Sequence, residues 1–191
     1  MELVFATHNQ NKFREVKGLL PGHISLLSLK DIGCSHEIPE TEDTLEGNAL
    51  LKAKHVSDHH GYPCFADDTG LLVDALNGAP GVHSARYAGA QKSAEDNMDK
   101  LLKALKGKHR TAQFKTVIAL RNGTENQLFT GIVKGQITPE KHGRRGFGYD
   151  PIFRPEGYDK TFAELPLAEK NRISHRGRAI QHLITYLKTQ G

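Results

Sequence analysis

Short apolar runs alternate with amphipathic segments in the first third of the chain. Residues 2–6 and 24–29 are short apolar runs, typical of buried strands in a parallel sheet. Apolar positions at helical spacing predict a helix over about 11–20 between them. A second helix is expected after residues 43–46, which resemble a capping box, with Gly61 as its C-cap. This order of strand, helix, strand, helix indicates an α/β protein.

The remainder of the chain adds further strands and helices to this pattern. A short strand is expected over 64–66, and Ser93 can cap a helix that extends to about 105. Residues 111–120 and 127–136 predict two strands joined as a long antiparallel hairpin. Residues 151–153 predict a short strand or sheet edge, and residues 166–188 predict two helical pieces. The sequence therefore favours a mixed α/β sheet within a single domain over residues 1–191.

The stretch Pro63–Leu71 interrupts an apolar run with two adjacent carboxylates, Asp67 and Asp68. Carboxylates at the end of a buried strand are costly unless something pairs with them. Mg²⁺ is a suitable partner, since it prefers carboxylates together with water and phosphate oxygens. Neighbouring residues of a regular strand face opposite sides, so two metal ligands here would require a turn, which Thr69-Gly70 suggests. An ordinary turn without a metal is the alternative.

A polar loop between the first strand and the first helix suits phosphate binding. The helix would direct its N-terminal N–H groups at the loop, and this arrangement favours anions. Thr7 and Asn9 add side-chain donors, and Lys12 adds a positive charge. A plain Asn N-cap would explain Asn9 but would give Thr7 and Lys12 no role.

Composition narrows the class of protein. Hydrophobic residues make up 37% of the chain and charged residues 25%, as in a soluble globular protein. No apolar run approaches the ~18 residues of a membrane span. Residues 31–46 are acidic and residues 141–178 are basic, which suits a metal and a polyanion respectively. Two solvated faces, or a nucleic-acid partner for the basic segment, are the alternatives.

Cysteine and histidine positions favour a cytoplasmic protein without a zinc site. Cys34 and Cys64 lie in dissimilar contexts, and we expect both to be reduced thiols. His55 and His59 have the spacing of metal ligands on a helix. No carboxylate or cysteine near them in the sequence completes a zinc site, so a solvated helix face is expected.

Five sequence blocks, taken together, resemble the inosine triphosphate pyrophosphatase family, also called Ham1-like proteins. They occur in the family's order and cover nearly the whole chain. One position departs from the family, because Glu42 stands where a glycine is usual. The blocks are Ala6-Thr7-x-Asn9-x-x-Lys12, Glu40-Thr41-x-x-Thr44-x-x-x-Asn48-Ala49, Ala66-Asp67-Asp68-Thr69-Gly70-Leu71, Gly146-Phe147-Gly148-Tyr149-Asp150-Pro151 and Ser174-His175-Arg176-Gly177.

The resemblance implies a fold and an activity. The implied fold is an elongated mixed sheet with flanking helices, in which two lobes surround an active-site cleft. The implied activity is Mg²⁺-dependent hydrolysis of ITP, dITP and XTP to the monophosphate and pyrophosphate, which keeps deaminated purines out of DNA and RNA. Family members are typically homodimers, and we expect no membrane association and no stable nucleic-acid partner.

The resemblance also implies roles for matched residues. Lys12 would neutralise charge on the leaving pyrophosphate, and Asp68 would accept the proton of the attacking water. Glu40, Asp68 and Asp67 would hold Mg²⁺, with Asp67 either sharing that work or orienting Asp68. The expected substrate contacts are Thr7, His8, Asn9, Gln10, Asn11, Lys12, Thr69, Phe147, Gly148, Tyr149, Asp150, Lys170, His175 and Arg176.

The residues by themselves allow other interpretations. Phe147 and Tyr149 could be core residues, and Lys170, His175 and Arg176 could form a solvated helix start capped by Ser174. A nucleotide pyrophosphatase of the Maf type is the nearest alternative enzyme, but the Ser-His-Arg-Gly block argues against it. A non-catalytic nucleotide- or RNA-binding module is disfavoured because carboxylates repel a polyanion unless a metal intervenes.

Overall fold

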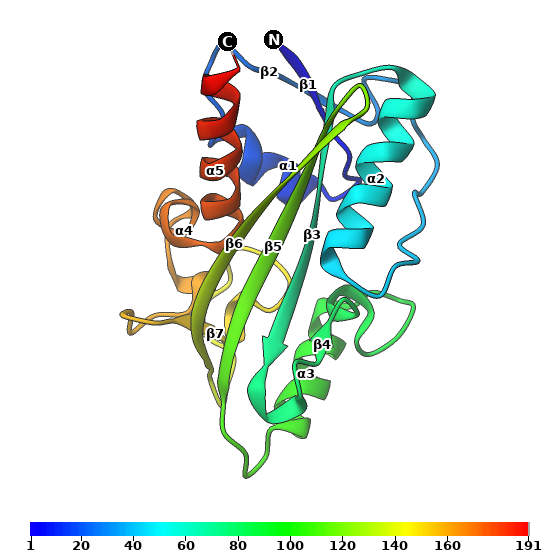
Figure 1. The fold of residues 1–191 in the computed structure, drawn as a ribbon. Helices are drawn as coiled ribbons and strands as arrows, with labels where there is room; N and C mark the ends of the chain where they lie inside the picture. The colour runs from blue at the N-terminus through cyan, green and yellow to red at the C-terminus, as the bar shows by residue number, and fades with distance from the viewer. Residues whose placement is uncertain (191) are drawn as a thin grey trace. The chain divides into compact units, whose positions relative to one another are not determined.

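The computed structural model describes residues 1–190 and shows a mixed sheet flanked by helices (Figure 1). Within these residues the sheet has seven strands in the order β2-β1-β3-β5-β6-β7, with β4 paired to β3. β1 is parallel to both β2 and β3, whereas β4 and β7 are antiparallel to β3 and β6. The strands are β1 (Glu2–Phe5), β2 (Ser25–Ser28), β3 (Cys64–Val73), β4 (Pro80–Gly81), β5 (Thr111–Asn122), β6 (Glu125–Ile137) and β7 (Phe153–Pro155).

Five α-helices accompany these strands in the described chain. No helix within residues 1–190 combines the length and the apolar character needed to cross a bilayer. The expected mixed α/β class is therefore confirmed. The helices are α1 (Gln10–Lys17), α2 (Leu45–His60), α3 (Ala94–Ala104), α4 (Leu167–Ile173) and α5 (His175–Thr189).

The chain forms two compact units, and three strands contribute residues to both. The first unit contains residues 1–68, 116–131 and the chain from 176 onward, and the second contains 69–115 and 132–175. Consequently β3, β5 and β6 each begin in one unit and end in the other.

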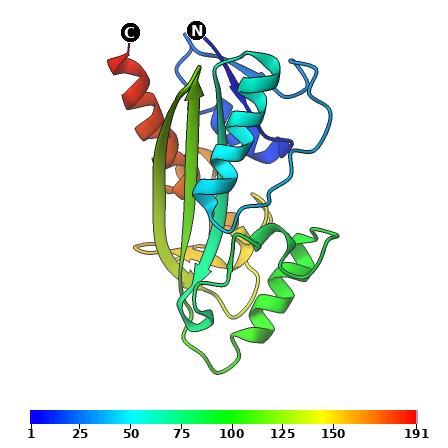
Figure 2. The same cartoon turned by 45° about the vertical axis from the view of Figure 1, so that its right-hand side comes forward.

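An apolar core formed by strands and α5 holds the first unit together. Ile180 and Leu183 of α5 are fully buried in this core. Phe5 of β1 and Phe65 of β3 stack with ring centroids 4.6 Å apart. In the first unit, α2 lies on the other side of these strands from α5 (Figures 1 and 2). The strands are thus covered on both faces, as expected for parallel pairing.

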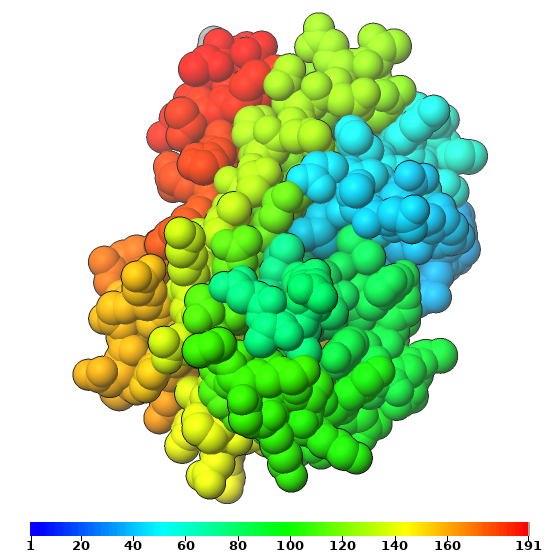
Figure 3. All heavy atoms as spheres, turned by 60° about the horizontal axis from the view of Figure 1, so that its bottom comes forward, coloured from blue at the N-terminus to red at the C-terminus, as the bar shows by residue number. Residues whose placement is uncertain are grey.

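An aromatic core and the apolar face of α3 hold the second unit together. Leu101 of α3 is fully buried in this core. Phe114 packs against Phe153 with ring centroids 4.7 Å apart. On the surface of this unit, residues near Lys141, in yellow, lie beside α3, in green (Figure 3), and Lys141 pairs there with two carboxylates of α3.

Most element predictions are confirmed. Gly61 ends α2 with a φ of 72°, and Ser93 caps α3 by accepting a hydrogen bond from the N–H of Asp96. β5 and β6 are neighbours in the sheet, and residues 167–189 form two helices separated at Ser174.

Three local predictions are wrong. α1 ends at Lys17, about one turn before the predicted end. The N–H of Leu19 donates to the carbonyl oxygen of Val16, which is the tighter 3₁₀ pattern that often ends an α-helix. Thr44 is the N-cap of α2, so the third helical residue is Gly47, which has no side chain to complete a capping box. Residues 151–152 belong to a 3₁₀ turn, and the short strand expected there is β7, which begins at Phe153.

The turn expected at Thr69-Gly70 is also absent, because β3 continues unbroken from Cys64 to Val73. Gly70 has a packing role instead. A Cβ at this position would lie 2.8 Å from the carbonyl oxygen of Gly81 in β4. The glycine therefore permits β4 to pair closely with β3.

We predict that Gly70→Ala lowers the free energy of unfolding by about 1–3 kcal/mol, because the new methyl group meets backbone that cannot move easily. The measurement is a urea denaturation midpoint. Gly22→Ala is the matched control, since a Cβ there meets nothing within 4 Å. Equal midpoints for the two variants would contradict the proposed close approach.

Candidate active site

The loop after β1 ends in a capped helix, as the sequence predicted. The Oδ1 atom of Asn9 accepts hydrogen bonds from the N–H groups of Asn11, at 3.0 Å, and Lys12, at 3.2 Å. The N–H of Asn9 itself donates to Oγ1 of Thr7 at 3.1 Å. Residues 8–11 are exposed, so the N-terminus of α1 is open to solvent. A helix N-terminus of this kind attracts anions.

Lys12 and Arg176 both bind Asp67, which is 1% exposed at the middle of β3. The ammonium group of Lys12 lies 3.0 Å from Oδ1, and Nε of Arg176 lies 3.3 Å from Oδ2. Arg176 is itself buried, and its Nη1 lies 2.5 Å from the carboxylate of Glu15 on α1. Asp67 thus links α1, β3 and α5 through two cations.

These cations determine the charge state of Asp67. Burial alone would raise the pKa of this carboxyl group. The positive charges of Lys12, Arg176 and Lys52 outweigh burial and hold the pKa well below its usual range. Asp67 is therefore ionised at neutral pH and at moderately acidic pH.

α2 organises the second carboxylate, Asp68. The amide group of Asn48 donates to Oδ2 of Asp68 at 3.1 Å. The same side chain accepts from the N–H of Glu42 at 3.0 Å and donates to its carbonyl oxygen at 3.2 Å. Asn48 therefore fixes the loop before α2 to β3, with Glu42 contributing only backbone atoms to these bonds.

Lys52, one turn further along α2, binds two groups of the same site. Its ammonium group lies 2.5 Å from the carboxylate of Glu40 and 2.6 Å from the backbone oxygen of Asp67. The carboxylate of Glu40 is thereby held next to β3, although Glu40 lies 27 positions before Asp67. The neighbouring charge of Lys52 overcomes burial and lowers the pKa of Glu40.

Asp68 differs from Asp67 in its electrostatic surroundings. Burial raises the pKa of Asp68 above its ordinary value, and the negative charge of Glu40 adds to this effect. Lys52 and Lys12 oppose the shift without cancelling it. Asp68 is accordingly the more basic of the two carboxylates and the better proton acceptor.

Because β3 is regular here, Asp67 and Asp68 face opposite sides of the strand. Asp67 meets α1 and α5, whereas Asp68 meets α2. The strand therefore separates a carboxylate that anchors cations from one that can act as a base.

In the second unit, Asp150 organises the loop that carries Phe147. Its Oδ2 atom accepts from the N–H of Phe147 at 2.9 Å and from the ammonium group of Lys170 at 2.6 Å. The Lys170 nitrogen also lies 4.9 Å from the centre of the Phe147 ring. A Cβ at Gly146 would lie only 2.0 Å from Oδ2 of Asp150, so this loop requires a glycine there.

Tyr149 and His175 are core residues of the second unit. The hydroxyl of Tyr149 donates to the backbone oxygen of Ser84 at 2.7 Å, and burial raises the pKa of Tyr149. The His175 ring stacks on Phe114 with centroids 4.4 Å apart. Thr69 is half-buried on β3, and Gly148 has a φ of 63°.

The structure thus gathers the predicted residues in two groups. In the first unit, direct contacts join Lys12, Asp67 and Arg176, and Thr7 and Asn9 lie just before Lys12. In the second unit, contacts join Phe147, Asp150 and Lys170. The solvated helix start considered for Lys170, His175 and Arg176 is wrong, because all three are at most 3% exposed.

Three residues of this network were not among the predicted site residues. Glu15, Asn48 and Lys52 each bind a predicted residue directly. Asn48 and Lys52 are four positions apart on one helix, and Glu15 is three positions after Lys12. Polar side chains at such spacings share a helix face and were the available signal.

Known proteins and solved structures resemble this chain over nearly its full length. The family model described as the Ham1 family matches residues 3–186. The chain belongs to the Ham1 family. The resemblance seen in its five sequence blocks is therefore confirmed.

Individual Ham1 relatives cover the chain from end to end. A dITP/XTP pyrophosphatase of Flavobacterium johnsoniae is 63% identical over 188 residues, which is 98% of each chain. The solved Ham1 protein of Staphylococcus aureus is 40% identical, with a TM-score of 0.90 and full coverage of both chains. The Ham1 protein of Coxiella burnetii is also 40% identical, with a TM-score of 0.91 and 99% coverage of both.

We predict that Arg176→Met lowers the free energy of unfolding by about 3–5 kcal/mol, because it leaves Glu15 and Asp67 as buried carboxylates without their guanidinium partner. The test is a urea denaturation midpoint by circular dichroism. Lys54→Met is the control, since Lys54 is exposed on α2 of the first unit and should change stability by less than ~0.5 kcal/mol. An Arg176→Met protein as stable as this control would refute the buried network.

Proposed function

We propose that this protein hydrolyses the non-canonical purine nucleoside triphosphates ITP, dITP and XTP to the monophosphate and pyrophosphate. The observation that carries the proposal is the pair Asp67-Asp68 on β3, set among Lys12, Lys52 and Arg176. Relatives named dITP/XTP pyrophosphatase, at 63% and 60% identity, support the choice of substrate.

The triphosphate is assigned to the N-terminus of α1. The N–H groups there and the side chains of Thr7 and Asn9 offer donors to phosphate oxygens, and Lys12 offers a charge. Pyrophosphate leaves with the electron pair of the broken α–β phosphoanhydride bond, and Lys12 stabilises the charge that develops on it. The exposed residues His8, Gln10 and Asn11 lie in the same loop.

Glu40 and Asp68 are the residues best suited to hold Mg²⁺. Their carboxylates are close enough that the charge of Glu40 raises the pKa of Asp68, and a divalent cation would relieve this repulsion. Both oxygens of Asp67 already bind cations, so we assign Asp67 the role of positioning Lys12 and Arg176. Bound Mg²⁺ would supply Lewis-acid polarisation of a phosphate oxygen.

Asp68 is assigned as the proton acceptor in the reaction. Water attacks the α-phosphorus, a P–O bond forms, and the released proton passes to the carboxylate of Asp68. Asn48 keeps the carboxylate in place through its bond to Oδ2.

The nucleoside contacts are assigned by the family resemblance. The half-buried Phe147 ring offers a face for base stacking, and Gly148 permits close approach of backbone. Asp150 would act through Phe147 and Lys170, which it holds. The other assigned contacts are Thr69, Tyr149, His175 and Arg176.

The setting of the enzyme is part of the same proposal. We assign it to the cytoplasm, where nucleotide pools lie and free thiols such as Cys34 and Cys64 persist. The family match runs from residue 3 to 186 through both units, which supports one Ham1-like domain. A homodimer and Mg²⁺ dependence are proposed from the family resemblance.

We expect ITP and XTP to yield monophosphate and pyrophosphate in equal amounts. The reason is that contacts of Lys12 and the α1 N-terminus favour pyrophosphate as the leaving group. Separate assays for pyrophosphate and orthophosphate, with Mg²⁺ present, check this. Diphosphate and orthophosphate as primary products would exclude the assigned reaction.

Asp68→Asn should lower kcat by a factor of at least ~10² while the fold stays intact, because the amide cannot accept the proton of water. Steady-state kinetics with ITP, alongside circular dichroism spectra, measure both effects. Asp159→Asn serves as the control, since Asp159 is exposed in the second unit and should keep full activity. A nearly active Asp68→Asn enzyme would show that another group is the base.

A further inference from the structure

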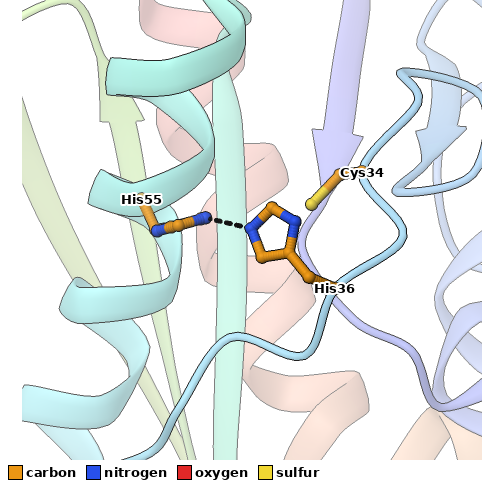
Figure 4. A group of neighbouring side chains, drawn as sticks. All are labelled: Cys34, His36 and His55. Atoms are coloured by element: carbon orange, nitrogen blue, oxygen red, sulfur yellow. Dashed lines mark hydrogen bonds between the residues drawn. The ribbon is translucent and has the colours of Figure 1, made fainter.

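Cys34, His36 and His55 form a cluster of metal-ligating side chains in the first unit (Figure 4). Cys34 and His36 lie in the loop after β2, and His55 projects from α2. The Nε2 atoms of the two histidines are 2.8 Å apart, and one ligand atom from each residue lies within 4.8 Å of the others. Within residues 1–190, this is the one group of three such side chains that meets this distance limit.

Hydrogen bonds and a ring contact hold the segments that carry the cluster. The N–H of Cys34 donates to the backbone oxygen of Leu29 at 2.8 Å, which closes the turn after β2. The backbone oxygen of His36 lies 2.9 Å from Nε2 of His8. The rings of His55 and His59 stack with centroids 4.4 Å apart. The backbone of Cys34 and His36 and the ring of His55 are therefore held in place without a metal, whereas the exposed side chain of His36 can still adjust.

Sequence spacing alone could not reveal this group, because Cys34 lies 21 positions before His55. No cysteine stands near the helix histidines in the sequence, but Cys34 lies close to His55 in the folded chain. A hydrogen-bonded histidine pair would explain the contact between His36 and His55. It gives no reason for a buried thiol near both rings.

The geometry points to a Zn²⁺ site, and we propose that Cys34, His36 and His55 bind one zinc ion. A thiolate with two imidazoles is a ligand set that zinc accepts and that Mg²⁺, which prefers oxygen, does not. The Cys34 thiol would release its proton to solvent on binding. Since His36 is exposed, a water molecule can fill the fourth tetrahedral position.

The two imidazoles need only a small movement to accept the ion. Tetrahedral Zn²⁺ with Zn–N bonds of about 2.0–2.1 Å places its two nitrogens about 3.3 Å apart. The observed 2.8 Å separation must therefore widen by about half an ångström. His36 lies in a loop with an exposed side chain, so this residue can make the adjustment.

Zinc at this position would tie the loop before α2 to the helix itself. His36 is four residues before Glu40, and His55 is three residues after Lys52, which binds Glu40. A ligand that binds only the folded state raises stability. The site would therefore stabilise the segment that carries Glu40 without touching the carboxylates.

The test uses the purified full chain freed of metal. Zinc affinity and stoichiometry are measured by calorimetry, and Co²⁺ serves as a spectroscopic probe of the same site. We expect each chain to bind one zinc ion, and we expect this binding to depend on Cys34. The Co²⁺-loaded protein should show a thiolate-to-cobalt charge-transfer band in the near ultraviolet. The band distinguishes this cluster from any metal at Glu40 and Asp68, which offer no sulfur.

Substitutions complete the test. Cys34→Ser, His36→Ala and His55→Ala should each weaken zinc binding by at least ~100-fold, and Cys34→Ser should abolish the cobalt band. His109→Ala, an exposed histidine of the second unit, should bind zinc as the wild type does. Absence of zinc binding, a wild-type cobalt spectrum without the thiolate band, or unchanged affinity in the three variants would overturn the proposal.

Discussion

Burial of two adjacent carboxylates on one strand is the constraint on which the candidate site depends. Asp67 and Asp68 are at most 6% exposed, and an unpaired charge in such surroundings costs several kcal/mol. The chain meets this cost with Lys12 from α1, Lys52 from α2 and Arg176 from α5. These partners fix the three helices of the first unit to the same strand. Lys12 and Arg176, which stabilise this unit, are therefore also residues assigned to contact the substrate.

The alternation of a regular strand gives the two carboxylates different tasks. Asp67 faces two cations and is held ionised, whereas Asp68 faces the amide of Asn48 and the nearby charge of Glu40. Neighbouring residues with opposite pKa shifts are typical of sites that separate charge stabilisation from proton transfer. A turn at Thr69-Gly70 would have lost this separation, and the close approach of β4 explains the glycine instead.

The sequence was sufficient to predict the class of fold, the family and most helices and strands. The helices and strands depend on local patterns of apolar residues, and the family depends on the order of the five sequence blocks. The sequence could not show which groups Glu15, Lys52 or Cys34 contact, since their partners belong to other elements of the fold. Arg176 illustrates the limit best. Its partner Asp67 is 109 positions away, and only the packing of α5 against β3 joins them. Charge and spacing suggested a solvated helix start for this residue, but the side chain is buried in the structure.

The central claim is that water attacks the α-phosphorus while pyrophosphate leaves. Hydrolysis of ITP in ¹⁸O-labelled water, followed by mass spectrometry of the products, tests this most directly. The account predicts one labelled oxygen in the monophosphate and none in the pyrophosphate, because the new P–O bond forms at the α position. Label in the pyrophosphate would mean attack at the β-phosphorus and would contradict the roles given to Asp68 and Lys12.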